Sequence, residues 1–394
     1  MRTAERVHRI KPSPSTAAAQ RVRELKASGL RILDLTVGEP DFDTPEHVKA
    51  AAIEAIQRGE TKYTPVNGTP ELRAAIASRL LSRHGLRYPA EAITVGGGAK
   101  QVIFLALMAT VDTGDEVIIP APYWVSYPDM VLANDGTPVI VSCPESDGFK
   151  LTPGRLAAAI TPATRWVVLN APGNPTGAAY TAGELRALAD VFLAQPHVSV
   201  LTDEIYDEIW YEPDQAPTLV GVEPRLRDRV FVTNGVSKTY AMTGWRIGYG
   251  AGPAELVAAI NKLQSQISSC PSSISQAAAV AALSGPQDFI ASTVAVYQGR
   301  RDKAAKLLND IPGISCSAPS GGFYLFVNCT ALLGNGPIRT DGDFARYLLE
   351  SQQVAVIHGA AYGSPGYFRI SFATSNAILD EACDRIARAC TDLS

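Results

Sequence analysis

Short apolar segments alternate with segments of helical pattern along much of this chain. Five of the apolar segments are expected to form strands: Glu116–Pro122, Thr137–Cys143, Arg165–Pro172, Val198–Tyr206 and Arg229–Gly235. Between two of them lies the helical pattern Thr181–Ala194, in which Thr181 and Glu184 match a capping box, S/T-x-x-E. Strands that are apolar throughout and alternate with helices are typical of a parallel sheet covered on both faces. The sequence therefore predicts an α/β fold.

The last third of the chain has a different pattern. Tyr297–Ile311 predicts a helix with a charged, exposed face, and Asn376–Leu393 predicts an amphipathic helix. Three further segments are expected to be strands of a smaller mixed sheet: Gly321–Asn328, Val354–Gly359 and Phe368–Thr374. We expect an N-terminal arm, a small domain built from both parts of the chain that flank the centre, and a large central domain. Their expected ranges are 1–15 for the arm, 16–47 and 290–394 for the small domain, and 48–289 for the large domain.

The composition excludes several classes of protein. With 394 residues, 46% hydrophobic and 19% charged, the chain is typical of a protein with a large core. The net charge of −4 and the lack of a basic face argue against nucleic-acid binding. No run of about 18 apolar residues predicts a membrane span, and the opening segment has no apolar stretch typical of a secretory signal. The six cysteines show no C-x-x-C spacing and the five histidines are dispersed, so we expect reduced thiols, no metal site and a cytoplasmic protein.

Glycines and polar residues follow several of the predicted strands, where ligands gather in open α/β sheets. Gly96–Gln101 follows a short strand and begins an apolar helix, so its backbone N–H groups are suited to a phosphate. Asn174 lies in the turn after one strand, and Asp203 and Tyr206 lie at the end of another. Each feature also has an ordinary explanation: a tight glycine turn, a plain turn, or a solvated acidic turn or helix start.

The segment Val232–Gly250 begins like a buried strand and ends small and apolar, yet it contains Lys238 and Arg246. Charged residues are rarely buried without a partner, so these cations indicate an anionic ligand, with surface positions as the alternative. A phosphate cradle, a carboxylate, a phenol, an amide and a lysine at strand ends together suit pyridoxal phosphate, which binds to lysine as a Schiff base. The sequence therefore predicts this cofactor.

Seven motifs distributed over nearly the whole chain are similar to those of one enzyme family. They are LTVGEPDFDTPEHV, KYTPVNGTPELR, APYWVSYPDM, NAPGNPTGAAY, LTDEIYDEI, GVSKTYAMTGWRIGYGAGP and FRISFATS. Through them the chain resembles the class I, fold-type I pyridoxal-phosphate aminotransferases, in the branch of bacterial aspartate and prephenate aminotransferases. The resemblance implies a large domain with a mostly parallel seven-stranded sheet flanked by helices, together with a small α+β domain.

The resemblance also implies how the cofactor is held. Lys238 is then the Schiff-base lysine, Asp203 binds the pyridine nitrogen, and Tyr206 and Asn174 bind the ring oxygen. Lys238, Asp203 and Tyr206 are the implied catalytic residues. The other implied cofactor contacts are Gly98, Ala99, Lys100, Trp124, Ser237, Arg246 and, from the neighbouring subunit, Tyr63. A ligand donated by a neighbour implies a homodimer with shared active sites.

The same resemblance implies how the α-carboxylate of the substrate is bound. Arg369 clamps this carboxylate and Gly38 contacts it through its backbone, while Trp124 and Asn174 also face the substrate. The implied reaction is transamination of aspartate or glutamate with 2-oxoglutarate or oxaloacetate, with prephenate as a further acceptor. Its implied partners are small molecules, an amino acid and a 2-oxo acid.

The side-chain pocket is less clearly specified. The segment Leu263–Gln276 lacks the arginine that binds the distal carboxylate in some aspartate aminotransferases, so this role falls to Lys11 and Lys100, with Ser15 nearby. A solvated lysine is the ordinary explanation of Lys11. Ser15 and Cys270 also differ from the residues common in relatives. Aromatic or broad specificity therefore stays open.

Other functions remain possible on this reasoning. A lyase or decarboxylase on the same fold would release its product without a 2-oxo acid acceptor. A non-enzymatic regulator would need a DNA-binding module, for which the N-terminal segment is too short and insufficiently basic. A sugar- or nucleotide-binding module would show no yellow chromophore.

Overall fold

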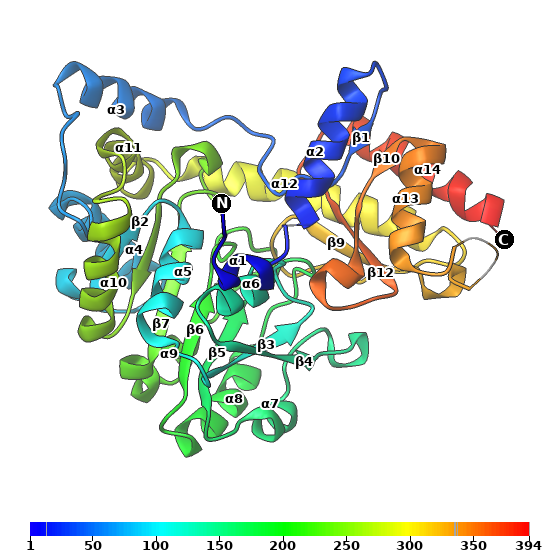
Figure 1. The fold of residues 1–394 in the computed structure, drawn as a ribbon. Coiled ribbons are helices and arrows are strands. Elements are labelled where there is room, and N and C mark those ends of the chain that lie inside the picture. Colours follow the sequence, from blue (N-terminus) through cyan, green and yellow to red (C-terminus); the bar gives the residue numbers. More distant parts are fainter. Residues whose placement is uncertain (13, 335, 337, 394) are drawn as a thin grey trace.

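The computed structural model describes residues 1–12, 14–334, 336 and 338–393, and of Ser15 it describes only the backbone. The chain forms two lobes (Figure 1). The larger lobe contains a seven-stranded sheet, and the smaller lobe contains the C-terminal segments together with α2. The short helix α1, Glu5–Arg9, lies across the large lobe beside α6.

The large sheet has the strand order β2-β8-β7-β6-β5-β3-β4. All neighbours are parallel except those of β8, which runs antiparallel to β2 and β7. The strands are β2 Ile93–Gly96, β3 Glu116–Ala121, β4 Thr137–Ser142, β5 Thr164–Asn170, β6 Ser199–Asp203, β7 Val230–Gly235 and β8 Gly248–Ala251. The five predicted strands are thus confirmed, with ends that differ by at most three residues.

Helices cover both faces of this sheet, as the apolar strands predicted. On β5, Val167 and Leu169 belong to one apolar cluster, whereas Trp166 and Val168 belong to another on the opposite face. This alternation follows from the two-residue period of a strand. The helices of the large lobe are α3 Glu46–Gln57, α4 Pro70–His84, α5 Ala99–Thr110, α6 Tyr127–Ala133, α7 Pro153–Ala159, α8 Ala182–Ala194, α9 Leu219–Val222, α10 Ala254–Ile267 and α11 Ser273–Ser284.

Two local predictions can be compared directly with the structure. The capping box is present at the start of α8, where Thr181 and Glu184 bond to each other's backbone N–H groups. The strand predicted to end at Tyr206 ends instead at Asp203. There the backbone turns because the Asp203 carboxylate accepts from the N–H of Ile205, and the N–H of Asp207 donates to the carbonyl of Glu204. This turn brings both Asp203 and Tyr206 to the carboxyl edge of the sheet.

The small lobe contains two sheets, so the prediction of one mixed sheet was wrong. β11 and β9 pair antiparallel with β12 on either side, whereas β1 pairs parallel with β10. The segment predicted as one strand, 354–359, divides at Val356 because its first half pairs with β1 and its second half with β12. The elements are β1 Leu33–Asp34, β9 Tyr324–Asn328, β10 Val354–Ala355, β11 Ile357–His358, β12 Tyr367–Ser371, α2 Pro14–Ala27, α12 Asp288–Asn309, α13 Asp341–Gln352 and α14 Asn376–Leu393.

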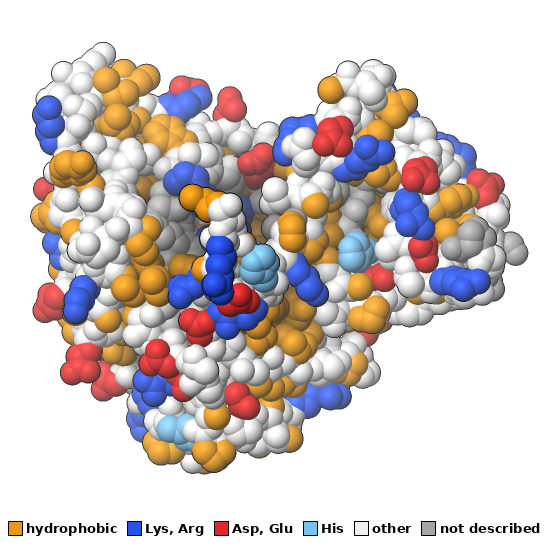
Figure 2. All heavy atoms as spheres, viewed as in Figure 1, with side chains coloured by type: hydrophobic (Ala, Val, Ile, Leu, Met, Phe, Trp, Pro, Cys, Tyr) orange, Lys and Arg blue, Asp and Glu red, His pale blue; other side chains and the backbone are white. Residues whose placement is uncertain are grey.

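The surface is hollowed between the two lobes, and basic side chains lie near this hollow (Figure 2). Within the described part of the chain, no helix is long and apolar enough to cross a membrane. The same residues contain no group of three or more potential metal-ligating side chains.

Candidate active site

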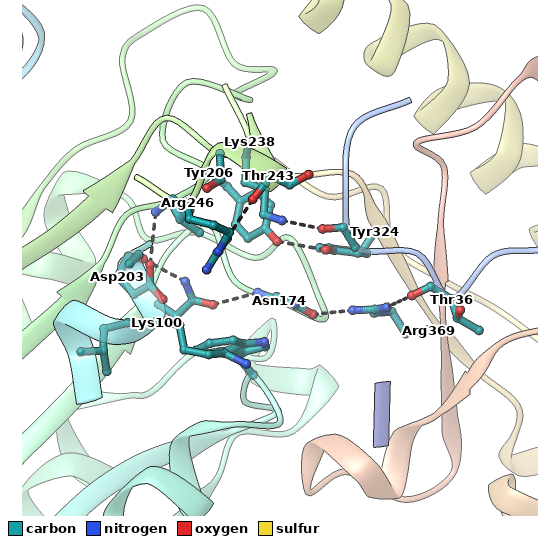
Figure 3. A pocket seen from close by; sticks show the side chains of 17 residues that line it. Thr36, Lys100, Asn174, Asp203, Tyr206, Lys238, Thr243, Arg246, Tyr324 and Arg369 are labelled. Atoms are coloured by element: carbon teal, nitrogen blue, oxygen red, sulfur yellow. Dashed lines mark hydrogen bonds between the residues drawn. The ribbon is translucent and has the colours of Figure 1, made fainter. Parts of the chain in front are cut away.

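A pocket of about 320 Å³ lies between the carboxyl edge of the large sheet and the small lobe. It receives side chains from the ends of β5 and β6, from the loop after β7, from the start of α5, and from β9 and β12 (Figure 3). Most of the predicted site residues line it: Gly38, Ala99, Lys100, Trp124, Asn174, Asp203, Tyr206, Ser237, Lys238, Arg246 and Arg369. Segments far apart in the sequence therefore converge on one cavity.

Lys238 lies in the loop that follows β7, and its amine donates a hydrogen bond to the carbonyl of Gly38. Burial lowers the pKa of Lys238 to about 8. Glu39 and Asp203 oppose this shift, whereas the cations Arg246 and Arg369 add to it. A lysine needs a depressed pKa to be unprotonated, and hence nucleophilic, near neutral pH. The surroundings of Lys238 therefore suit a reactive amine.

Asp203 and Tyr206 come from the turn after β6, and both are buried. Asp203 is 4% exposed, and its carboxylate accepts a 2.6 Å hydrogen bond from the hydroxyl of Tyr127 on α6. Burial raises the pKa of Asp203 to about 6, while the bond from Tyr127 opposes that rise. The carboxylate is thus mainly ionised at neutral pH and is available to a cationic group in the pocket.

The alternative that Asp203 and Tyr206 lie in a solvated acidic turn was wrong, because the turn that carries them is buried. Glu204, Asp207 and Glu208 are all buried on the other side of the turn. Glu208 pairs with Arg79, and Asp207 with His84, both from α4. The turn therefore has a back face bound to α4 and a front face that lines the pocket.

The expectation that the whole segment Val232–Gly250 is buried was wrong at Arg246. Its side chain is exposed, and its backbone is left-handed, with φ 57°, directly after a short 3₁₀ helix at Thr243–Trp245. Its guanidinium donates to the carbonyls of Thr243 and Gly97 at 2.9 and 3.2 Å. Gly98 packs against this guanidinium, and its φ of 97° favours glycine. The predicted Gly98 thus lies against Arg246 rather than lining the cavity.

Arg246 and the first turn of α5 together form an anion-binding arrangement. The backbone N–H groups at a helix N-terminus point outward without helical partners and attract negative charge. Here that terminus, at Ala99, lies beside a guanidinium and a hydroxyl, that of Ser237. Burial, and secondarily Arg246, lower the pKa of Lys100, whose amine lies 4.7 Å from the centre of the Trp124 ring. No salt bridge of Arg246 is present among the described residues.

Arg369 on β12 is 2% exposed, although it carries a permanent charge. Its guanidinium donates to the side-chain oxygen of Asn174 at 3.0 Å and to the carbonyl of Thr36 at 2.6 Å (Figure 3). Its Nε has no hydrogen-bond partner among the residues that the structure describes, and none of their carboxylates forms a salt bridge with it. A buried cation without an anion is strongly unfavourable. The site therefore provides for an anionic group of a ligand.

Besides Gly98, the predicted residues Tyr63 and Lys11 lie outside this pocket. Tyr63, in the loop between α3 and α4, is 90% exposed. Lys11 is exposed and lines an adjoining cavity of about 470 Å³, which also touches Lys100 and Arg246. Its backbone N–H donates to Asp129 at 3.0 Å. The side chain of Ser15 lies outside the described part of the structure.

The pocket also contains residues that the sequence did not single out. They are Thr36, Ile103, Asn170, Ile205, Thr243 and Tyr324. Asn170 and Thr243 belong to motifs that had been recognised, so a complete reading of those motifs would have found them. Tyr324 lies in a strand predicted only for its apolar pattern, and nothing in that pattern marks its hydroxyl as part of a site.

Comparisons with known proteins identify the family. The model of the family described as aminotransferase class I and II matches residues 31–386. The chain belongs to the class I and II aminotransferases. The resemblance found in the sequence, the fold and the aminotransferase activity are thereby confirmed.

Individual aminotransferases match over almost the full length. An aspartate aminotransferase of Rhizobium meliloti (strain 1021) is 52% identical over 99% of this chain and 97% of that protein. An aspartate/prephenate aminotransferase of Cereibacter sphaeroides is 49% identical over 98% of both. The crystal structure of the aspartate aminotransferase from Rhizobium meliloti superposes with a TM-score of 0.97 at 51% identity and covers both chains fully. That of the Thermus thermophilus aspartate aminotransferase with maleate has a TM-score of 0.92 at 38% identity, covering 99% of this chain and 100% of that one.

Proposed function

We propose that this aminotransferase binds pyridoxal 5′-phosphate through Lys238. The observation that carries the proposal is the placement of this amine, with a pKa of about 8, in a pocket whose cations Arg246 and Arg369 lack anionic partners among the described residues. The pocket suits the cofactor because it offers positive groups for the negative phosphate and a carboxylate for the positive ring nitrogen. A phosphate suits Arg246, Ser237 and the start of α5, and a pyridinium nitrogen suits the Asp203 carboxylate. The lack of a side chain at Gly98 lets the guanidinium of Arg246 lie against the backbone at the start of α5.

The remaining ring contacts follow from the same pocket. Tyr206 and Asn174 would bind the ring oxygen, and Trp124 would stack on the ring. Pyridoxal phosphate supplies an electron-withdrawing ring that stabilises the negative charge left when a substrate loses its α-proton. Within the chain, Asp203 keeps a negative charge at the ring nitrogen and so favours the protonated ring.

Lys238 would then act twice. It would hold the cofactor before the substrate arrives. Its freed amine would then take the α-proton as a general base and return it, as a general acid, to a carbon of the cofactor. Arg369, with the backbone of Gly38, would bind the α-carboxylate and so orient the α-C–H bond towards this amine. Arginine suits this task because its planar fork matches a carboxylate. The amino group passes to the acceptor in a second half-reaction, so we expect ping-pong kinetics.

The proposed substrates are aspartate or glutamate with 2-oxoglutarate or oxaloacetate, and prephenate as a further dicarboxylic acceptor. Support comes from the similar proteins, which are named aspartate or aspartate/prephenate aminotransferases, and from the structure of one of them with maleate, a dicarboxylate. Lys100 lies at the rim of the pocket and Lys11 in the adjoining cavity, so both are candidates for the distal carboxylate, with Ser15 as a third.

The proposed assembly is a homodimer with shared active sites. Support comes from Tyr63, which extends into solvent from a loop at 90% exposure and would reach the phosphate of a neighbouring subunit. We also propose the division into an arm (1–15), a small domain (16–47 and 290–394) and a large domain (48–289), in a cytoplasmic enzyme. Support comes from the apolar clusters: one lies within 48–289, and the other lies mainly in the small lobe, with four residues of 205–211 packed against it.

Two measurements test the proposed function. The purified protein should turn yellow when loaded with pyridoxal phosphate, as an absorbance spectrum would show. Borohydride reduction should then attach the cofactor irreversibly to Lys238. A panel of aspartate, glutamate, phenylalanine and alanine against two 2-oxo acids should then give the highest kcat/KM for the acidic donors. Preference for phenylalanine or alanine would contradict the acidic specificity. Product release without an acceptor would favour the lyase alternative.

A further inference from the structure

Tyr324 contacts two of the proposed functional side chains although it belongs to no recognised site motif. It lies on β9 and is 1% exposed. Its hydroxyl is 2.9 Å from the hydroxyl of Tyr206, and its ring centre is 4.3 Å from the guanidinium carbon of Arg369 (Figure 3). Tyr206 belongs to the large lobe, whereas Tyr324 and Arg369 belong to the small lobe. One aromatic side chain therefore joins the two halves of the pocket.

The sheet of the small lobe fixes this arrangement. In the pairing of β12 with β9, Arg369 lies opposite Phe326 and Ser371 opposite Tyr324. Residues opposite each other point to the same face, and so do residues two positions apart on one strand. Arg369 and Tyr324 are therefore diagonal neighbours on one face. The stacking of the ring on the guanidinium follows from the register rather than from a flexible loop.

The hydroxyl of Tyr324 acts on Tyr206. Burial raises the pKa of both phenols, and that of Tyr206 lies well above its ordinary value. The cation of Arg369 and the bond with Tyr206 oppose the rise at Tyr324. Either hydroxyl can donate in this pair; in the proposed site Tyr206 donates to the cofactor, so Tyr324 is the residue that donates to the oxygen of Tyr206. The hydrogen of Tyr206 is then free to point to an acceptor in the pocket.

The ring of Tyr324 acts on Arg369. A guanidinium over an aromatic face is attracted by the ring quadrupole, most strongly where water is excluded. Two of its nitrogens are already directed to Asn174 and Thr36, so the ring of Tyr324, together with that of Tyr362 at 5.3 Å, limits the remaining rotation of the guanidinium. A guanidinium held in this way loses less entropy when it binds a planar carboxylate.

We infer that Tyr324 is a positioning residue of this aminotransferase with two separable actions. Its hydroxyl orients the hydroxyl of Tyr206 towards the ring oxygen of the cofactor, and its ring orients Arg369 towards the carboxylate of the substrate. The inference rests on the proposed function, in which Tyr206 and Arg369 bind these two groups.

Two substitutions separate the actions in the holoenzyme. Tyr324→Phe removes one oxygen and keeps the ring, whereas Tyr324→Leu removes both. Tyr297→Phe is the matched control, because Tyr297 is equally buried in the same lobe, contacts Phe323 and does not line the pocket. The measurements are the pH midpoint of the colour change of the bound cofactor and the dissociation constant of maleate, which carries carboxylates but no amino or keto group.

We expect Tyr324→Phe to raise the pH midpoint by about 0.5–1 unit, equivalent to the loss of one hydrogen bond, because Tyr206 becomes a weaker donor to the ring oxygen. Maleate affinity should stay within about twofold in this variant. In Tyr324→Leu the midpoint should rise similarly, and maleate should bind about 5–30-fold more weakly because the cation–π contact is lost. Tyr297→Phe should change neither quantity.

An unchanged midpoint in Tyr324→Phe would overturn the action of the hydroxyl, and an unchanged maleate affinity in Tyr324→Leu would overturn that of the ring. A shift of equal size in Tyr297→Phe would assign the effects to general loosening of the lobe and would also overturn the inference. Failure of the proposed function is distinguishable, because wild-type protein would then show no chromophore at all. Maleate binding would in that case still decide the action of the ring.

Discussion

The turn after β6 has two faces that treat buried charge in opposite ways. On its back face, Glu208 and Asp207 are paired with Arg79 and His84 of α4, so these two carboxylates have partners within the chain. On its front face, Asp203 is neighboured by the pocket in which Arg246 and Arg369 have no carboxylate partner among the described residues. The back face supports the turn. The front face leaves charge unbalanced, and this imbalance is what a ligand can satisfy.

The comparison teaches that burial alone does not mark a functional charge. Glu204, Asp203, Asp207 and Glu208 are all buried within one short turn. Only Asp203 faces a cavity large enough for a ligand. The useful criterion is a buried or cavity-lining charge whose counter-charge is not supplied by the chain, because retaining such a charge costs stability that a ligand can restore.

The largest expected effect concerns the front face. Replacing Lys238 by Ala should lower kcat by at least about 10⁴-fold, since both the covalent attachment and the proton transfer are lost. Circular dichroism should show an unchanged fold. Steady-state transamination with a coupled assay measures the loss. A variant that retains more than about a hundredth of the activity would contradict the role of Lys238.

The next effect concerns the back face. Replacing Arg79 by Met leaves the buried Glu208 with only the longer 3.6 Å contact to Arg83, so the free energy of unfolding should fall by about 2–4 kcal/mol. The exposed pair of Arg58 with Glu60 offers a control, and Arg58→Met should lower the free energy of unfolding far less than Arg79→Met, because solvent screens an exposed pair. Urea unfolding of the cofactor-free protein measures both. Equal losses in the two variants would remove the distinction between the back face and an ordinary surface.

A smaller effect of opposite sign is expected at Asp203. Because its folded pKa, about 6, lies above its unfolded value, the folded state binds the proton more tightly, and stability falls as pH rises from about 4 to 6. Asp203→Asn lacks this loss, and its single amide oxygen can still accept from Tyr127, although the longer 3.3 Å bond from the N–H of Ile205 is given up. The cofactor-free variant should therefore be about 1–3 kcal/mol more stable at pH 7–8 and show no advantage below about pH 4. Lower stability of the variant at pH 7 would show that this face, too, is balanced.

The smallest effect is a pH dependence of cofactor capture. Lys238 reacts as the neutral amine, and its pKa is about 8. The rate at which cofactor-free protein develops the chromophore should therefore fall about tenfold per pH unit below 8 and level off above it. Stopped-flow absorbance between pH 6 and 9 gives the profile, with Lys238→Arg as the variant that forms no chromophore. A flat profile would mean that burial does not depress this pKa.

The sequence predicted the large lobe well because its signals are local. Apolar strands, the capping box at Thr181 and the glycines around Gly98 each depend on residues close in the chain. The small lobe was predicted less well. The segment 354–359 has the pattern of one strand, but it is divided between two sheets by β1, whose residues are more than 300 positions away.

The site shows the same limit. The motifs identified Asp203, Lys238 and Arg369, yet Tyr324 was missed because its role depends on the register between β9 and β12 and on the closeness of Tyr206 across the lobes. Arg246 was expected in the interior, but the left-handed turn that exposes it is not visible in the apolar residues around it. Tertiary pairing, rather than composition, decides these cases.

The antiparallel β8 has a consequence for the loop that carries Lys238 and Arg246. Gly235 at the end of β7 pairs with Gly248 at the start of β8, so the intervening residues form a closed loop whose two ends touch. Both cations therefore lie in one loop whose two ends are held together by the pairing of β7 with β8. Any displacement of this loop therefore moves the amine of Lys238 and the guanidinium of Arg246 together, and an insertion in the loop would change the distance between them.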